Sequence, residues 1–196
     1  VVDSQVSRRV LTALGRCKVV LRTGVGFDVI DVEAATELGI AVIIVPDLWI
    51  REVANHALAL LLACNRKIVV LDRSVRSGRW VPIIPPRVGP LHGETLGLVG
   101  LGRIGQALAR RAMALELNVI AHDPYLPAEV FGGLEVESVS MDDLLSRSDY
   151  VSVHSPKTDE TFHLFDEVAL RKMKPTAYLI NTSRGPVVDE AALVRA

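Results

Sequence analysis

The sequence has few cysteines, almost no net charge and no long apolar run, and each shortage excludes a class of protein. The 196 residues include two cysteines, Cys17 and Cys64, and neither belongs to a CxxC pair or to a cysteine–histidine cluster. This arrangement gives no support to a disulfide framework or to a metal site. We therefore expect two buried free thiols, no bound metal and the reducing environment of the cytoplasm.

Charge and hydropathy exclude two further kinds of partner. Lysine plus arginine number 22 and aspartate plus glutamate 23, so the net charge of −1 gives no electrostatic reason to expect nucleic acid or an anionic membrane surface. No apolar run reaches the ~18 residues of a membrane span, and the longest are Ile40–Pro46 and Ala57–Cys64. The composition, 49% hydrophobic and 23% charged, is that of a globular domain.

The two ends of the sequence lead us to expect a piece of a longer protein. The chain begins with Val1 rather than methionine, and it ends at Ala196, inside a helix expected to begin at Asp189. A domain seldom ends within a helix whose apolar face is still unmatched.

Short β-rich runs alternate with helical stretches, which predicts an α/β fold with a parallel sheet. Residues 1–50 contain roughly one and a half βα units, too few for a complete sheet, so we assign them to a partial domain and residues 51–196 to a second domain. The expected strands are Lys18–Leu21, Ala41–Val45, Thr95–Val99, Asn118–His122, Tyr150–His154 and Ala177–Asn181. The expected helices are Asp31–Leu38 (capped by Asp31 and closed by Gly39), Arg51–Arg66, Arg103–Leu115, Met141–Ser146 and Asp166–Met173.

Two neighbouring segments suggest a symmetric homodimer. Arg51–Arg66 is apolar around most of its circumference, which favours burial between domains or subunits. Arg73–Pro90 is rich in proline, especially in its second half Val81–Pro90, and is typical of a linker or an extended arm. Burial of the helix inside one subunit is the alternative. The helix's expected apolar stripe consists of Val53, Ala57, Leu60, Leu61 and Cys64.

A glycine-rich loop, GLGRIG at residues 100–105, follows the strand Thr95–Val99. Three glycines within six residues also arise by chance, and a plain strand-to-helix turn is the alternative. Here the context that the GxGxxG motif requires is present: an apolar strand enters the loop, a helix leaves it, and the next strand ends at Asp123, near the expected spacing of ~20 residues. The sequence therefore predicts a dinucleotide-binding loop of the Rossmann type.

Each position of this loop has a physical role in holding a diphosphate. Gly100 permits the sharp turn, Gly102 lets the backbone approach the pyrophosphate, and Gly105 lets the helix pack closely on the strand. The helix then begins at Arg103 and Ile104, where unpaired N–H groups face the phosphates.

Asp123 predicts the preferred cofactor. Its carboxylate can accept hydrogen bonds from the ribose hydroxyls and would repel a 2′-phosphate, so we expect NAD rather than NADP. Arg103 lies inside the glycine loop, where it is placed for the pyrophosphate or for solvent rather than for a 2′-phosphate.

Several segments, in this order along the chain, resemble the D-isomer-specific 2-hydroxyacid dehydrogenases. This family includes phosphoglycerate dehydrogenases, glyoxylate/hydroxypyruvate reductases and the C-terminal-binding-protein corepressors. The run VPDLWIREVANHALALLL is most similar to bacterial relatives of the corepressor branch. The matching segments are Arg22–Asp31 (RTGVGFDVID), Val53–Leu62 (VANHALALLL), Leu98–Gly105, His122–Tyr125 (HDPY), Tyr150–Thr161 (YVSVHSPKTDET) and Ile180–Gly185 (INTSRG).

The resemblance implies two lobes and a substrate site. Residues 1–50 would be part of a flavodoxin-like substrate domain, and residues 51–196 a Rossmann-type NAD-binding domain. Arg184 matches the catalytic arginine, whose guanidinium suits a carboxylate and polarises the neighbouring carbonyl; a structural salt bridge is the alternative. Val25 and Gly26 match a loop whose N–H groups hold the substrate carboxylate, for which a simple glycine turn is the alternative.

The resemblance also implies the residues that surround the cofactor. Positions lining the nicotinamide are matched by Thr182 and Ser183, together with Arg184. The loop beside the cofactor's ribose and adenine is matched by His154, Ser155, Pro156 and Thr161.

The implied activity is reversible hydride transfer between NAD and a small D-2-hydroxy acid or its 2-keto acid. The family's acid/base histidine and its orienting glutamate lie downstream of the arginine, and the residues after Arg184 include no histidine. We therefore expect these 196 residues to lack the pair. His154 belongs to the cofactor pocket in the resemblance, and His56, His92, His122 and His163 have no acidic residue at an interpretable spacing.

Two alternatives stay open. One is an NAD(H)-sensing, corepressor-like binding module without catalysis, and the other is a formate- or phosphite-oxidising relative on the same scaffold. An intact downstream glutamate and histidine would favour catalysis, and their loss would favour binding.

Overall fold

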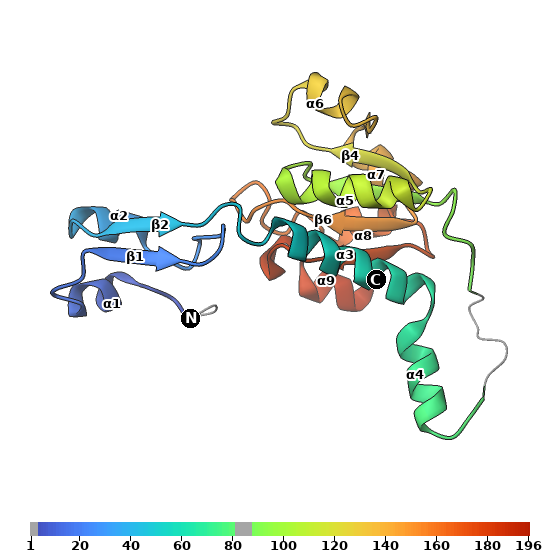
Figure 1. Cartoon of the computed structure of the whole chain (residues 1–196), viewed down its shortest axis with the longest axis horizontal. Helices are drawn as coiled ribbons and strands as arrows, with labels where there is room; N and C mark the ends of the chain where they lie inside the picture. Colours follow the sequence, from blue (N-terminus) through green and yellow to red (C-terminus); the bar gives the residue numbers. More distant parts are fainter. Residues whose placement is uncertain (1–3, 81–87) are drawn as a thin grey trace. The chain divides into compact units, whose positions relative to one another are not determined.

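The computed structural model describes residues 4–80 and 88–196, and the chain divides into two units, Val1–Ile50 and Arg51–Ala196 (Figure 1). Every strand and helix expected from the sequence is present, and each end lies within one residue of its expected position.

The first unit is a pair of parallel strands covered by two short helices. Strands β1 (Val19–Arg22) and β2 (Ala41–Ile44) pair directly, and α1 (Arg8–Ala13) and α2 (Val32–Glu37) pack together. The buried core of this unit consists of Leu11, Ala34, Ala35 and Ile40.

The expected ends of α2 are confirmed. The carboxylate of Asp31 accepts a hydrogen bond from Ala34 N at 2.8 Å, and Gly39 follows the helix with a left-handed φ of +66°. Helix α1, by contrast, was not predicted. It is six residues long and buries Leu11 alone, so its sequence carries little periodic signal.

The second unit contains a five-stranded sheet in which all neighbouring strands are parallel, in the order β5-β4-β3-β6-β7. The chain builds outward from β3 to β4 and β5, then returns to add β6 and β7 on the other side of β3. The strands are β3 (Thr95–Val99), β4 (Asn118–His122), β5 (Glu137–Ser138), β6 (Tyr150–Val153) and β7 (Tyr178–Asn181). The helices are α3 (Ile50–Asn65), α4 (Ile68–Arg76), α5 (Arg103–Ala114), α6 (Ala128–Gly132), α7 (Met141–Arg147), α8 (Glu167–Lys172) and α9 (Glu190–Arg195), and η1 (Gly185–Val187) is a 3₁₀ turn.

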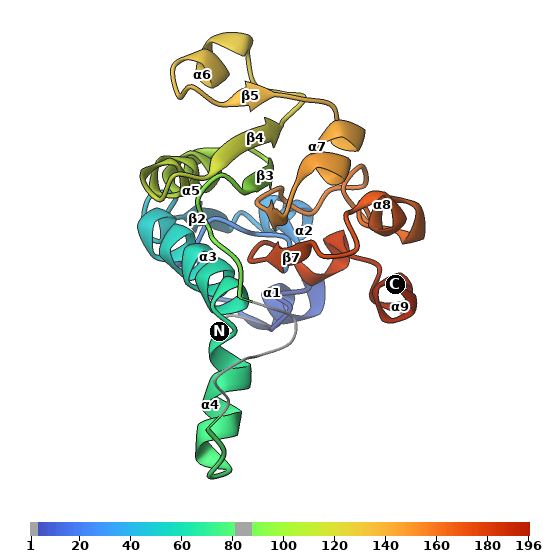
Figure 2. The same ribbon diagram turned by 90° about the vertical axis from the view of Figure 1, so that its right-hand side faces the viewer.

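Helices cover both faces of this sheet, as Figure 2 shows with α3 and α5 on one side and α7 and α8 on the other. Because side chains alternate along a strand, β3 sends Leu96 and Leu98 to the α3/α5 face and Val99 to the opposite face. In the same way β6 contributes Tyr150 to the first core and Val153 to the second. This doubly wound arrangement buries β6 on both faces, so all four of its residues, Ser152 included, are buried.

Two expectations about α3 and the segment after it were wrong. Residues 73–76 belong to α4, so the segment expected to be a loop from Arg73 is helical at its start, and residues 81–87 of the proline-rich stretch lie outside the described part of the chain. Within the expected stripe of α3, Leu60 is exposed and Val53 and Cys64 are only half-buried. The buried stripe is Ala54, Ala57, Leu61 and Asn65.

The stripe was misplaced because a helix that is apolar on most sides does not reveal its buried face. Asn65 is buried, and its side-chain amide donates a hydrogen bond to the hydroxyl of Tyr150 at 2.9 Å. A long-range contact of this kind leaves no periodic signal.

Within the described residues, no single helix is long and apolar enough to cross a membrane. Helices α3 and α4 meet the length and hydropathy criteria only when taken together, and they are bent by 63° at the break between them.

Candidate cofactor site

The register of the sheet brings the expected cofactor residues to one edge. Val99, His122, Val153 and Asn181 pair across β4, β3, β6 and β7, so these four strands end in the same row. Gly100, Asp123, His154 and Thr182 follow these four residues directly in the sequence. The row spans the point where the strand order reverses between β3 and β6, which is where open α/β sheets bind ligands.

The glycine loop has the geometry expected of it. Gly100 has a φ of +94°, and a Cβ there would lie 3.0 Å from the backbone of His154. A Cβ on Gly105 would lie 2.4 Å from the Gly100 carbonyl oxygen, so the start of α5 is packed against the turn. Gly102 faces open space, and the exposed Arg103 begins α5. The side chain of Ile104 packs against the core, which leaves its backbone for any role at the helix start.

Asp123 points at this loop. Its Oδ2 accepts a hydrogen bond from Leu101 N at 2.9 Å, and its Oδ1 accepts one from Tyr125 N at 3.1 Å. Two backbone amides therefore fix the carboxylate beside the glycine turn. This orientation is the one that the ribose-binding hypothesis requires.

The segment after β6 places a neutral histidine and a buried hydroxyl near the loop. His154 N donates to Val99 O at 2.8 Å, and its Nε2 lies 2.9 Å from Ser152 Oγ. Burial lowers the pKa of His154 to about 4. Ser155 is buried, whereas Pro156 is exposed.

Thr161 holds its own loop together. Its hydroxyl donates to Pro156 O at 2.6 Å and accepts from Thr158 N at 2.7 Å. The structure thus gives Thr161 a role in shaping the segment 156–161, and its proposed contact with the cofactor stays a prediction.

The turn after β7 presents Thr182, Ser183 and Arg184, all partly buried. Asn181, which the sequence analysis did not single out, organises this turn. Its Oδ1 accepts from Ser183 N at 3.0 Å and from Ser183 Oγ at 2.9 Å, and its Nδ2 donates to Arg184 O at 2.9 Å. The sequence carried one signal for this role of Asn181: an amide side chain at the end of a strand, just before the segment that contains the arginine.

In the first unit, Val25 and Gly26 lie in the loop after β1. Arg22 Nε donates a hydrogen bond to Gly26 O, and Trp49 Nε1 donates one to Thr23 O at 2.8 Å, so side chains hold this loop at two points. Side-chain hydrogen bonds therefore hold the loop in shape, and its residue Val25 is exposed. The contact of this loop with a substrate stays a prediction.

The site residues fit a dinucleotide. Ser155 Oγ and Thr182 Oγ1 are buried side-chain atoms without a hydrogen-bond partner among the described residues, and each follows a strand of the row. Buried hydroxyls normally have a partner, and a polar ligand can supply one. Together with the open backbone at Gly102 and the N-terminus of the twelve-residue helix α5, they offer what a nucleotide needs.

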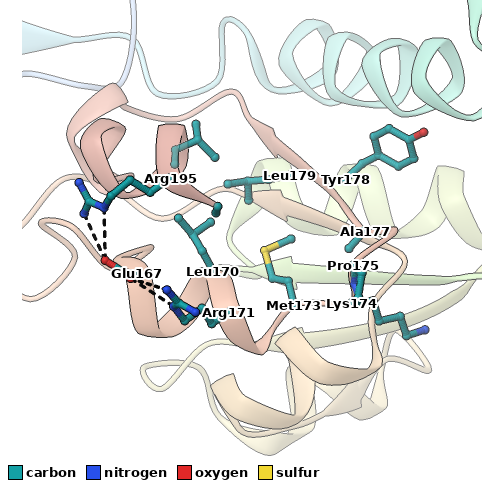
Figure 3. A pocket seen from close by; sticks show the side chains of 12 residues that line it. Glu167, Leu170, Arg171, Met173, Lys174, Pro175, Ala177, Tyr178, Leu179 and Arg195 are labelled. Carbon is teal, nitrogen blue, oxygen red and sulfur yellow. Dashed lines mark hydrogen bonds and ion pairs between the residues drawn. The ribbon is translucent and has the colours of Figure 1, made fainter.

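A separate cavity of about 510 Å³ lies between α8, β7 and α9 (Figure 3). Glu167 borders it and pairs with Arg171 and Arg195. No expected cofactor or substrate residue lines it, so we do not assign it to the site.

The predictions for the cysteines and histidines were confirmed only in part. Cys17 and Cys64 are free, as expected, but both are partly exposed rather than buried. Two histidines do lie near carboxylates: His92 is 3.8 Å from Glu116, and His163 is 3.8 Å from Asp189. These pairs arise from tertiary packing, so spacing in the sequence could not reveal them. Within residues 4–80 and 88–196, no three His, Cys, Asp or Glu side chains are grouped as a metal site would require.

A doubly wound parallel sheet with a glycine loop at its reversal point defines the second unit as a dinucleotide-binding domain of the Rossmann class. The comparison with known families is more specific. Residues 58–196 match the model described as "D-isomer specific 2-hydroxyacid dehydrogenase, NAD binding domain", and the chain belongs to that family.

Relatives with assigned activities match nearly the whole chain. It is 46% identical over 191 residues to D-3-phosphoglycerate dehydrogenase of Mycobacterium tuberculosis, covering 97% of this chain and 36% of that protein. It is 42% identical to glyoxylate reductase of Korarchaeum cryptofilum, covering 97% and 58% respectively. The chain thus spans about a third to three-fifths of the curated relatives that it matches.

A solved structure agrees with the fold. The crystal structure of D-lactate dehydrogenase from Aquifex aeolicus, complexed with NAD and lactic acid, superposes with a TM-score of 0.89 at 33% identity. The match covers 98% of this chain and 57% of the enzyme.

Proposed function

We propose that this chain is the cofactor-binding part of an NAD-dependent oxidoreductase that interconverts a small D-2-hydroxy acid and its 2-keto acid. The observation that carries the proposal is the row of four strand ends, which places the glycine loop, Asp123, Ser155 and the Arg184 turn along one edge of the sheet. Family membership supports the class of reaction.

In this proposal each residue has a defined task. The backbone at Gly102 and the first turn of α5 hold the diphosphate, and Asp123 binds the adenosine ribose. The hydroxyls of Ser155 and Thr182 donate hydrogen bonds toward the bound nucleotide. NAD, when bound, supplies the hydride acceptor. Arg184 binds the substrate carboxylate and stabilises negative charge on the carbonyl oxygen.

Proton transfer needs a group that we do not place among these residues. His154 is neutral at pH 7, is bonded to Ser152 and has a pKa of about 4, too low for a base that must work near neutrality. We propose that the acid/base pair comes from the part of the longer polypeptide that follows the arginine, as the family resemblance implies. The 196 residues alone should then bind NAD but turn over 2-hydroxy acids far more slowly than the whole protein.

Calorimetry with NAD and NADP tests the cofactor assignment. The chain should bind NAD more tightly than NADP, and Asp123→Ala should weaken NAD binding by about tenfold or more, since it removes a charged acceptor from the ribose. Asp123→Asn keeps the shape of the side chain but removes its negative charge. This variant should therefore have a smaller difference in affinity between NAD and NADP.

Asp166→Ala is the matched control, because Asp166 caps α8 with the same kind of carboxylate-to-amide bond and is not one of the cofactor residues. It should lower stability without changing NAD affinity. A well-folded chain that binds no dinucleotide would disprove the assignment.

We also propose that two copies associate through α4. Its face formed by Ile68, Leu71 and Val75 follows i, i+3, i+7 spacing, and Ile68 and Val75 are each more than half exposed. The described residues of the chain bury no residue of this helix.

A further inference from the structure

The turn that carries Arg184 is closed by one side chain, that of Asn181. The turn begins where β7 ends, and the 3₁₀ turn η1 follows it directly. Asn181 bonds to Ser183 through both the backbone N–H and the hydroxyl, and to Arg184 through the backbone carbonyl. A single amide group thus connects the strand end to two of the next three residues.

These contacts fix which amide atom points where. Ser183 N can only donate, so it must face Oδ1, and Arg184 O can only accept, so it must face Nδ2. The turn therefore needs an acceptor and a donor on one short, planar side chain. Aspartate would retain the acceptor and lose the donor, and alanine would lose both.

The Arg184 carbonyl is held from two directions. Asn181 Nδ2 donates to it from one side, and Val187 N donates to it at 3.2 Å from η1. Val187 is fully buried in the core, so the downstream end of the turn is anchored. The Arg184 side chain also folds against the turn, with its Nη1 donating to Ser183 O at 3.0 Å.

We propose that Asn181 is a positioning residue that sets the direction in which the Arg184 guanidinium leaves the sheet. The inference rests on the proposed function, in which that guanidinium binds a substrate carboxylate. A bidentate contact between arginine and carboxylate depends on orientation, so a turn free to rotate about Ser183 would weaken it. Asn181 itself touches neither substrate nor cofactor in this proposal.

Nuclear magnetic resonance of the 196-residue chain tests the positioning directly. In Asn181→Ala, the Ser183 amide should exchange with solvent at least about tenfold faster, because it loses its acceptor. The Arg184 Nε–Hε signal should shift or broaden. In Asn181→Asp, the Ser183 amide should stay protected while the Arg184 signal still changes, because only the donor to the carbonyl is lost.

Ser140→Ala is the matched control. Ser140 caps α7, with its Oγ accepting from Asp143 N at 3.1 Å, so its loss removes a comparable polar contact outside the turn. It should leave both Ser183 exchange and the Arg184 signal unchanged. If both Asn181 variants matched this control in the two measurements, the positioning role would be overturned.

Binding of oxalate to the NADH-loaded chain links the turn to the function. Wild type should bind oxalate, Arg184→Ala should abolish binding, and Asn181→Ala should weaken it by about tenfold, the loss expected for a misdirected charged contact. Unchanged oxalate affinity in Asn181→Ala would refute the positioning of a carboxylate ligand. If wild type and Arg184→Ala were equally unable to bind oxalate, the proposed role of Arg184 would fail, whereas the resonance measurements would still decide whether Asn181 orients the turn.

Discussion

His154 shows how burial decides the chemistry of a single residue. A histidine at a strand end is an obvious candidate for acid/base catalysis, because its ordinary pKa lies near neutrality. Here desolvation lowers that pKa to about 4, and the ring is bonded to the fully buried Ser152. The side chain is therefore a neutral hydrogen-bonding group at pH 7 rather than a proton carrier.

This lowered pKa predicts a pH dependence of stability. Above pH 6.5 His154 is neutral in both the folded and the unfolded chain and contributes nothing. As the pH falls below 6.5 the unfolded chain takes up a proton that the folded chain does not, so the free energy of unfolding decreases until about pH 4. Denaturant unfolding should show a loss on the order of 2 kcal/mol between pH 7 and pH 5.

The variant His154→Gln should lose this part of the pH dependence of stability. Comparison with the wild type therefore separates the contribution of His154 from those of the other histidines. Carboxylates such as Glu37 and Glu137 do not interfere in this window. Hydrogen bonds from Arg8 and Arg147 lower the pKa of these two groups below 4.5, so their contribution is lost only at lower pH. A His154 imidazole resonance that titrates near pH 6.5 would contradict the prediction.

At the scale of an element, two glycines in the segment from β3 through the loop to α5 have different surroundings. Gly105 is closed in by the Gly100 carbonyl, whereas Gly102 has no atom within 4 Å of a Cβ position. Both belong to the same motif, but one serves the contact of the helix with the turn, and the other leaves room for a ligand. Substitutions at the two positions should therefore have different consequences.

We predict that Gly105→Ala destabilises the chain by about 1–3 kcal/mol, because the new methyl group forces the backbone of the turn to move. Gly102→Ala should change stability by less than about 1 kcal/mol, the difference between glycine and alanine at a helix N-cap. It should nevertheless weaken NAD binding at least about tenfold, since its methyl group points to where the diphosphate would approach. Thermal unfolding and calorimetry on the two variants measure these effects, and a Gly102→Ala chain with unchanged NAD affinity would exclude the loop as the diphosphate site.

At the scale of the whole molecule, α4 stands apart because it is the one helix in the described part of the chain that has no buried residue. Helices α3 and α4 are bent by 63° at their junction, where Lys67 adopts a left-handed φ of +54°. Its ammonium group lies 4.5 Å from the centre of the Tyr178 ring and donates to the Tyr178 hydroxyl, which ties the junction to β7. A helix held at its start but buried nowhere is suited to contact a second subunit.

Sedimentation should therefore detect a dimer at micromolar concentration, and a double substitution Ile68→Glu and Val75→Glu should shift it to monomer by raising the dissociation constant at least about tenfold. Val168→Glu is the control, since Val168 is equally exposed but lies on α8. A wild-type chain that is monomeric at high micromolar concentration would rule out this interface.

Much of the fold and part of the site could be predicted because their signals are local. The expected strands and helices are present to within one residue, and Asp31 and Asp166 cap the helices that follow them. Short elements with few periodic positions, such as α1, α6 and β5, were missed. So was the role of Asn181, whose three hydrogen bonds become visible only when the turn has a defined geometry.

What the sequence determined by itself is the alternation of strands and helices, the sharp turn at Gly100 and the order of the family's motifs, because each depends on neighbours along the chain. The tertiary structure decided the strand order around β3, the row that brings Gly100, Asp123, His154 and Thr182 to one edge, and the low pKa of His154. These depend on hydrogen-bond register between distant strands and on the water excluded when two helical layers cover the sheet. Neither the register between strands nor the exclusion of water exists until segments far apart in the sequence have packed together.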